Sequence, residues 1–139
     1  IVDLAIVRHV HVGPEGDIEV GLAPTYSGCP ATSMIQAQVI AALKKAGFEH
    51  VTVVEVLSPP WTSDWLSAGA REKLRAYGIA PPAESVSSPR RLVHTPPRIC
   101  CPLCGSGNSS ETSRFGSTPC KALHRCNDCL EPFEYFKCI

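Results

Sequence analysis

Four of the eight cysteines occur as two C-x-x-C pairs, a spacing that is typical of metal-binding knuckles. Cys101 and Cys104 form the first pair, Cys126 and Cys129 form the second, and 21 residues separate the two pairs. Zinc binds four thiolates tetrahedrally at about 2.3 Å, and two tight turns that face each other can supply them with little strain. We therefore predict a zinc ribbon in which the metal is structural. Two disulfides of a secreted domain are the alternative, although the sequence shows no apolar signal segment.

The two knuckles differ in the residue that follows their second cysteine. Gly105 holds this place in the first knuckle, and glycine permits the positive φ angle that lets backbone N–H groups turn toward metal-bound sulfur. Leu130 holds the same place in the second knuckle. We therefore expect the second knuckle to turn differently.

Other candidate metal ligands carry weaker signals. Cys100 adjoins the first knuckle and is interpreted as a bystander thiol, because its neighbour has the correct spacing. Cys120 and Cys138 flank the knuckles and could form a second soft-metal pair, a disulfide or part of the core. His9 and His11 lie on the expected solvent face of a strand, so we do not expect them to bind metal.

A second candidate for chemistry is the single thiol of Cys29, in the run TYSGCP that precedes a predicted helix. Pro30 suits the first helical position because its missing N–H costs nothing there, which places Cys29 at or next to the N-cap. Unpaired amide hydrogens and the positive end of the helix dipole would then favour its thiolate form. The hydroxyls of Thr25 and Ser27 could cap the helix or donate to a ligand on the sulfur. The alternative is a buried thiol that acts as a small hydrophobic side chain.

The residues before the ribbon predict a small mixed domain. Residues 6–12 and 18–22 alternate apolar and polar side chains on either side of a Gly/Pro turn, which predicts a β-hairpin with one buried face. Apolar residues recur every four positions over residues 35–46, and a basic end with a glycine stop completes an amphipathic helix. Residues 50–57 are β-branched and apolar like a covered strand, and residues 70–77 predict a second helix. The order β-β-α-β-α predicts an α+β fold with the helices on one sheet face.

Three parts follow from these patterns. Residues 79–97 contain five prolines and three serines, which disfavour a helix and leave little apolar surface to bury. We predict an α+β domain at residues 1–78, a semi-extended linker at 79–97, and the zinc ribbon, built of β-hairpins, at 98–139. Because the sequence opens inside a strand-like stretch, we also expect a preceding segment.

The composition argues against several classes of function. The 139 residues are 44% hydrophobic and 6% aromatic, which leaves room for one modest core and a satellite module rather than a large enzyme. The 13 basic and 13 acidic residues balance, and no basic face is apparent, so nucleic acid is a poor candidate partner. No apolar run approaches the roughly 20 residues that span a bilayer, so we expect no membrane partner.

The sequence also carries family resemblances. The runs IVDLAIV at residues 1–7 and PTYSGCP at residues 24–30 resemble the SufT-like domain family, which is implicated in iron–sulfur cluster assembly. Four later runs resemble the PaaD-like family of bacterial phenylacetate degradation: PPWTSDW at 59–65, CPLCG at 101–105, FGSTPCKAL at 115–123 and CNDCLEPF at 126–133. Together the matches cover nearly the whole chain outside the linker.

The resemblance implies roles for particular residues. The reactive cysteine of the SufT-like family carries over onto Cys29 and its acidic position onto Asp3, so that both would bind a cluster or client. Thr25 joins this predicted site because its hydroxyl could donate to a ligand on the sulfur. Ala5 stands where that family usually has glycine, which implies a modest backbone adjustment.

For the whole chain the resemblance implies a cytoplasmic, non-catalytic protein. It would be an accessory or maturation factor that delivers or assembles iron–sulfur clusters for the metal centres of phenylacetyl-CoA epoxidase. Its cofactors would be structural zinc and a transient iron–sulfur cluster, and its partners the epoxidase components or their iron–sulfur or di-iron client. A homodimer stays open. The alternative is a non-catalytic structural subunit of the epoxidase complex. An enzyme with Cys29 as nucleophile is weaker, because the sequence places no His/Asp pair nearby.

Overall fold

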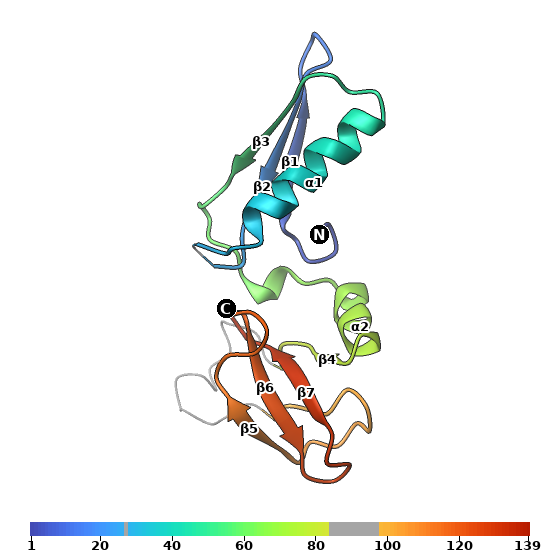
Figure 1. The fold of residues 1–139 in the computed structure, drawn as a ribbon, viewed down its shortest axis with the longest axis vertical. Helices are drawn as coiled ribbons and strands as arrows, with labels where there is room; N and C mark the ends of the chain where they lie inside the picture. Colours follow the sequence, from blue (N-terminus) through green and yellow to red (C-terminus); the bar gives the residue numbers. More distant parts are fainter. Residues whose placement is uncertain (27, 84–97) are drawn as a thin grey trace. The chain divides into compact units, whose positions relative to one another are not determined.

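The computed structural model describes residues 1–26, 28–83 and 98–139 (Figure 1). Its contacts divide the chain into two units, Ile1–Trp61 and Thr62–Ile139. Each unit has its own sheet, and the α+β class that the sequence predicts is confirmed. Within the described ranges, no helix combines the length and the apolar character that a membrane span requires.

The first unit is a three-stranded sheet with a helix against one face (Figure 1). β1 (Val7–Val12) and β2 (Ile18–Leu22) form the predicted antiparallel hairpin. α1 (Thr32–Lys45) follows and leads to β3 (Val51–Glu55), which pairs with β2 in parallel. Parallel neighbours need a crossover rather than a tight turn, and α1 supplies it. The sheet order is therefore β1-β2-β3.

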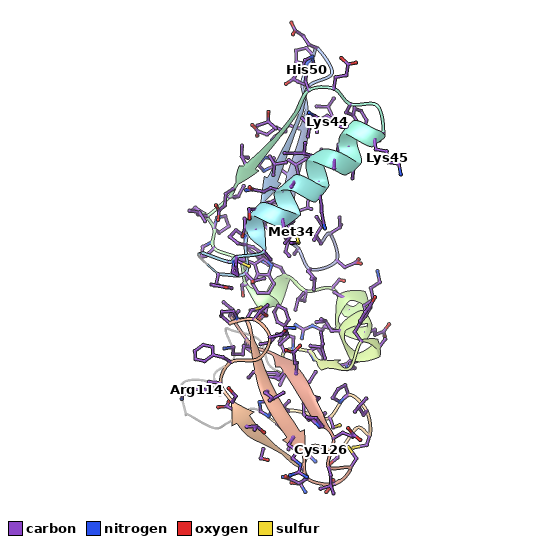
Figure 2. The ribbon with its side chains drawn as sticks, viewed as in Figure 1. Met34, Lys44, Lys45, His50, Arg114 and Cys126 are labelled. Atoms are coloured by element: carbon purple, nitrogen blue, oxygen red, sulfur yellow. The ribbon has the colours of Figure 1, made fainter. Side chains whose placement is uncertain are left out.

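The core of this unit lies between β2 and α1. Because side chains alternate along a strand, the branched residues of β2 share one face and are buried: Ile18, Val20 and Leu22. The apolar residues of α1, spaced by four, pack against them: Ile35, Val39 and Leu43. α1 ends with Lys44 and Lys45, the basic C-terminal end that the sequence predicts (Figure 2). The indole of Trp61 is buried and donates to the carbonyl of Leu4 at 2.9 Å, which holds the N-terminal turn.

In its described residues, 62–83 and 98–139, the second unit contains two short helices and a four-stranded sheet. Its elements in chain order are the 3-10 helix η1 (Ser63–Trp65), α2 (Ala68–Ala76), β4 (Ile79–Ala80), β5 (Ser109–Ser113), β6 (Lys121–Cys126) and β7 (Pro132–Phe136). β5, β6 and β7 form two antiparallel pairs, and β4 joins the edge of β7 in parallel. The buried core gathers Ala80, Ile99, Cys101, Ala122, Cys126, Phe133 and Tyr135.

Two features of the second unit differ from the sequence-based expectation. The helix predicted at 70–77 is present as α2, but its contacts group it with the second unit rather than with the first sheet. Ile79 and Ala80, expected to open the linker, pair with Glu134 and Tyr135. A strand of two residues has no periodicity to reveal it, and only its distant partner defines it. The boundaries 1–78, 79–97 and 98–139 stay a prediction, and residues 84–97 lie outside the described residues.

Candidate functional site

The two C-x-x-C knuckles bring four sulfur atoms together. The Sγ atoms of Cys101, Cys104, Cys126 and Cys129 all lie within 4.8 Å of one another. The Sγ atoms of Cys101 and Cys129 are 3.8 Å apart, and those of Cys104 and Cys126 are 3.6 Å apart. Four sulfurs at 2.3 Å from one tetrahedral ion lie about 3.8 Å apart, whereas a disulfide bond measures about 2.05 Å. The spacing therefore fits one metal ion and does not fit two disulfides.

Short hydrogen-bonded turns position these sulfurs. In the first knuckle, the N–H of Cys101 donates to the carbonyl of Ser106 at 2.8 Å, and that of Gly105 donates to the carbonyl of Cys101 at 2.9 Å. Cys126 ends β6 (Figure 2), and its N–H donates to the carbonyl of Glu131 at 3.0 Å. Backbone hydrogen bonds within each knuckle therefore hold its turn without help from a metal ion.

The expectation that the second knuckle turns differently is wrong. Gly105 has φ of +78° and Leu130 has φ of +66°, so both knuckles use the left-handed region at the same position. The Cβ atom of leucine makes this conformation unfavourable, which is why the sequence suggested another turn. The geometry of the sulfur quartet takes precedence over the local preference of Leu130.

The thiols of the quartet influence one another's ionisation. Backbone N–H groups of Cys129 and Asp128 point at the sulfur of Cys126 and lower its pKa to about 7, although burial acts in the opposite direction. The N–H of Glu131 lowers the pKa of Cys129, but burial and the neighbouring thiols outweigh it and raise that pKa to about 12. Four adjacent thiols therefore resist ionising together unless a cation compensates their charge, which suits a divalent ion such as zinc.

A polar clasp that the sequence did not reveal ties the two knuckles together. The carboxylate of Asp128, between the second pair of cysteines, accepts hydrogen bonds from the hydroxyl of Ser106 and, at 2.9 Å, from the side-chain amide of Asn108. These two hydrogen bonds lower the pKa of Asp128. The N–H of Asn127 also donates to the carbonyl of Asn108 at 2.9 Å. Polar residues near a metal knuckle are common, and only the tertiary structure shows which of them form hydrogen bonds with one another.

Cys29 lies in a small cavity of the first unit. The cavity has a volume of about 30 Å³ and is lined by Ile6, Leu22, Pro24, Thr25, Cys29, Thr32 and Ile35. Cys29 is half-buried and Thr25 is buried, so the structure brings these two predicted site residues to one place. The apolar side chains of Ile6, Leu22 and Ile35 that line the cavity belong to the core of the first unit. The sequence pattern identifies such residues as buried, but it does not reveal that they line a cavity.

The local geometry of Cys29 corrects one detail. α1 begins at Thr32 with Ala31 as its N-cap, so Cys29 lies two residues before the N-cap and Pro30 is not the first helical residue. The N–H of Thr32 donates to the carbonyl of Cys29 at 3.1 Å, and this turn precedes the helix. Gly28 has φ of +79°, which provides a sharp turn just before the thiol. Ser27 lies outside the described residues.

Asp3 is not part of the cavity. It is exposed and lies in the N-terminal turn, in which the N–H of Ala5 donates to the carbonyl of Val2 at 2.8 Å. Ala5 has φ of +52°, in the left-handed region that glycine adopts readily, and the expected backbone adjustment relative to the family stays a prediction. The turn leads directly into Ile6, which lines the Cys29 cavity.

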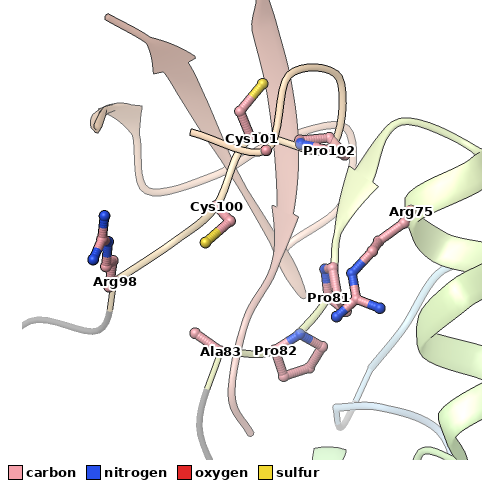
Figure 3. A pocket seen from close by; sticks show the side chains of 9 residues that line it. Arg75, Pro81, Pro82, Ala83, Arg98, Cys100, Cys101 and Pro102 are labelled. Atoms are coloured by element: carbon pink, nitrogen blue, oxygen red, sulfur yellow. The ribbon is translucent and has the colours of Figure 1, made fainter. Parts of the chain in front are cut away.

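The remaining cysteines lie outside the quartet. The sulfur of Cys100 points away from that of Cys101 (Figure 3), toward a cavity of about 300 Å³ in the second unit. That cavity is lined by Arg75, Pro81, Pro82, Ala83, Arg98, Cys100, Cys101, Pro102 and Gly105. The sulfur of Cys120 lies 3.0 Å from the hydroxyl of Thr118, and that of Cys138 lies 3.3 Å from the hydroxyl of Tyr135. Each of these two sulfurs has a hydroxyl neighbour.

Two family models match the chain. One is described as the PaaD zinc beta ribbon domain and matches residues 85–137. The other is described as an iron-sulfur cluster assembly protein and matches residues 1–57. The first match contains the sulfur quartet, and the second contains the Cys29 cavity.

Individual proteins agree with this division. Over all of its 139 residues the chain is 49% identical to an Escherichia coli (strain K12) protein named as a subunit of 1,2-phenylacetyl-CoA epoxidase, and it covers 81% of that protein. It is 38% identical over 72 residues to the Fe-S protein maturation auxiliary factor SufT of Staphylococcus aureus (strain USA300), a match that spans 51% of this chain and 82% of that protein. A crystal structure of a domain of unknown function, DUF59, from Bacillus anthracis has a TM-score of 0.51 and 26% identity, and the match covers 53% of this chain and 72% of that one.

Proposed function

Because the chain belongs to the PaaD family and joins an iron–sulfur assembly domain to a zinc ribbon, we propose that it is an accessory factor for the metal centres of a phenylacetyl-CoA epoxidase. In this role it delivers or assembles iron–sulfur clusters for an epoxidase component and does not take part in turnover. The likeness to an Fe-S maturation auxiliary factor supports the delivery role.

The observation that carries the proposal is the position of Cys29. Cys29 lines a small cavity with the buried Thr25, whereas the sulfurs of the knuckle cysteines are gathered in a quartet. Thiolate is a preferred ligand of iron in clusters, and the Thr25 hydroxyl can donate to a ligand held on the sulfur. Exposed Asp3 belongs to the proposed client-binding surface rather than to the cavity wall.

One thiol cannot complete the ligand set of a cluster. Clusters are generally held by four cysteines, so a cluster on Cys29 has to take its other ligands from a second copy of the chain, a small thiol or the client. Shared ligands make release easy, which suits transient carriage. A homodimer and a direct complex with an epoxidase component are the two arrangements that satisfy this need.

The ribbon has a different task in this proposal. One structural zinc ion would saturate its quartet and leave no ligand position for chemistry. It stabilises the second unit, which we propose docks an epoxidase component. Free thiols at Cys29 and in the quartet stay reduced in the cytoplasm, where we place the protein.

Two other functions compete with maturation. A non-catalytic structural role within the epoxidase is favoured by the name of the Escherichia coli relative and by the apolar lining around Cys29. Catalysis by Cys29 is less favoured, because the described residues that line the cavity include no histidine or carboxylate to serve as a general base.

Replacement of Cys29 separates these functions. The epoxidase components are co-expressed with the wild-type chain, with Cys29→Ser or with Cys100→Ser, and the purified oxygenase is assayed for assembly and iron content. We expect an assembled oxygenase that lacks iron with Cys29→Ser, and normal iron content with Cys100→Ser, which removes an exposed thiol outside the cavity. Normal iron content with Cys29→Ser would instead identify the protein as a structural subunit.

A further inference from the structure

The face of the first sheet opposite to α1 carries two histidines and a carboxylate in close proximity. In the β1–β2 ladder, His9 lies opposite Gly21 and His11 lies opposite Glu19. Side chains alternate along strands, so these residues project from the face opposite to that of buried Val20. The side chains of His9 and Glu19 are 31% and 46% exposed, so this place is open to solvent.

Gly21 determines where the His9 ring lies. A Cβ atom at Gly21 would overlap the imidazole of His9, so the ring rests directly over the backbone of the neighbouring strand. From there, Nε2 of His9 lies 3.2 Å from Oε1 of Glu19. The ring centroids of His9 and His11 are 4.8 Å apart, and the rings are tilted by 41°. One glycine thus brings an imidazole to both a carboxylate and a second imidazole.

The donor atoms of His9 and Glu19 are spaced like ligands that share one metal ion, and the ring of His11 lies near enough to join them by rotating its side chain. Two N or O donors at about 2.1 Å from an ion, at an angle of about 90° to 110°, lie about 3.0 to 3.4 Å apart. Two imidazoles bound to that ion have centroids about 4.5 to 5.2 Å apart by the same geometry. Both the 3.2 Å and the 4.8 Å separations fall within these ranges.

We propose that His9, His11 and Glu19 bind a divalent first-row transition ion such as Zn²⁺ or Ni²⁺ on the open face of the β1–β2 hairpin. Imidazole nitrogen with a carboxylate oxygen is a donor set that suits these ions and differs from the four thiolates of the ribbon. His11 is exposed, so its ring can turn to place a nitrogen on the ion, and water completes the coordination shell. The site is independent of Cys29.

A surface ion pair explains less of this arrangement. A solvent-exposed His–Glu pair contributes little to stability and needs no second imidazole beside it. The proposal instead requires all three side chains together, so single substitutions at each position distinguish the two explanations.

The test uses the full chain with its ribbon saturated with zinc and the Cys29→Ser substitution present in every sample, so that this thiol cannot bind the probe. Ni²⁺ is titrated by calorimetry near neutral pH, and its paramagnetic broadening is mapped in the ¹H–¹⁵N spectrum. We expect one Ni²⁺ per chain, with broadening centred on residues 8–11 and 18–21. His9→Gln or His11→Gln should weaken binding about tenfold or more, because each removes an imidazole ligand. Glu19→Gln should weaken it less, because the amide oxygen that remains is a neutral and weaker ligand.

Two controls keep the outcome clear. His50→Gln removes an exposed histidine just before β3 and should leave Ni²⁺ affinity unchanged. Ni²⁺ should also raise the melting temperature of the parent chain but not that of His9→Gln, since only a folded site is stabilised by its ligand. Broadening centred elsewhere, or equal affinity in the parent and the two histidine variants, would overturn the proposal.

Discussion

Among the described residues, two that are not glycine adopt the left-handed backbone region, which shows that the tertiary structure can override the conformational preference of a single residue. Ala5 and Leu130 both have positive φ, at +52° and +66°, and both stand where glycine would be the easy choice. The left-handed conformation costs a non-glycine residue about 1 to 2 kcal/mol. Ala5 turns the chain into Ile6 of the Cys29 cavity, and Leu130 closes the second knuckle, so both conformations serve a site.

Ala5→Gly should stabilise the first unit. Glycine removes the left-handed penalty but loses more entropy on folding, so the net gain should be about 0.5 to 1 kcal/mol. Urea denaturation followed by helical circular dichroism measures it. The same change at Ala42, inside α1, should instead destabilise by about 1 kcal/mol. A loss of stability in Ala5→Gly would contradict the left-handed turn.

Substitution of Asp128 offers a second test of a single residue. Asp128→Ala removes the acceptor of the hydrogen bonds from Ser106 and Asn108, and should weaken zinc binding about tenfold, as loss of outer-shell partners does. Competition with a chromophoric chelator measures the affinity. Glu131→Ala is the matched control, because Glu131 contacts the second knuckle through its backbone carbonyl. Equal zinc affinities in the two variants would show that the hydrogen bonds of Asp128 do not support the metal site.

Between elements, the β6–β7 pair is tied to the loop before β6 by Glu134. Its carboxylate accepts a hydrogen bond from the N–H of Ser117 at 2.7 Å and pairs with the ammonium of Lys121. Partial burial of Glu134 favours the neutral form, but Lys121 and Ser117 together outweigh it and lower the pKa of Glu134. The neighbouring Lys137 ammonium lies 4.7 Å from the Phe115 ring centroid and holds the same loop.

The lowered pKa of Glu134 predicts a pH-dependent contribution to stability. A carboxylate with a folded pKa below its unfolded value stabilises fully above the unfolded value of about 4.5 and loses this contribution as pH falls through the folded pKa. Glu134→Gln should therefore cost about 1 to 2 kcal/mol at neutral pH and progressively less below about pH 4.5. Denaturation of both proteins across this range measures the difference. A difference that stays constant across this pH range would contradict the assignment to Glu134.

At the scale of the whole molecule, the two units depend on metal to different extents. The second unit has Cys101 and Cys126 within its buried core, so its folding is linked to the ion that the quartet binds. The first unit has a separate core of β2 and α1 residues and no part in the quartet. The two units should therefore respond differently to loss of zinc.

Chelation of zinc from the full chain should unfold the ribbon and leave the first sheet folded. Hydrogen exchange is expected to lose protection in β5, β6 and β7, while β1, β2 and α1 keep theirs. Cys104→Ser should reproduce this pattern without a chelator, whereas Cys29→Ser should not. Loss of protection throughout the chain would show that the units fold as one, and full retention would show that the metal is dispensable.

The residues themselves determined the features that depend on short spacing. The two knuckles are visible because four cysteines at fixed intervals suit a tetrahedral ion. β1, β2 and α1 follow from periods of two and about four along the chain, and β3 follows from its run of β-branched apolar residues. Cys29 stood out because of the turn residues beside it. In each case the signal lies within one turn or one element.

Only the tertiary structure decided which distant positions meet. The pairing of β4 with β7, the Asp128 clasp, the lining of the Cys29 cavity and the His9 ring over Gly21 all join residues from separate elements. The left-handed Leu130 shows the same effect, because the geometry of the quartet takes precedence over the preference of one residue. Periodicity reports the face on which a side chain lies, whereas register and packing choose its neighbour, and these depend on the whole fold.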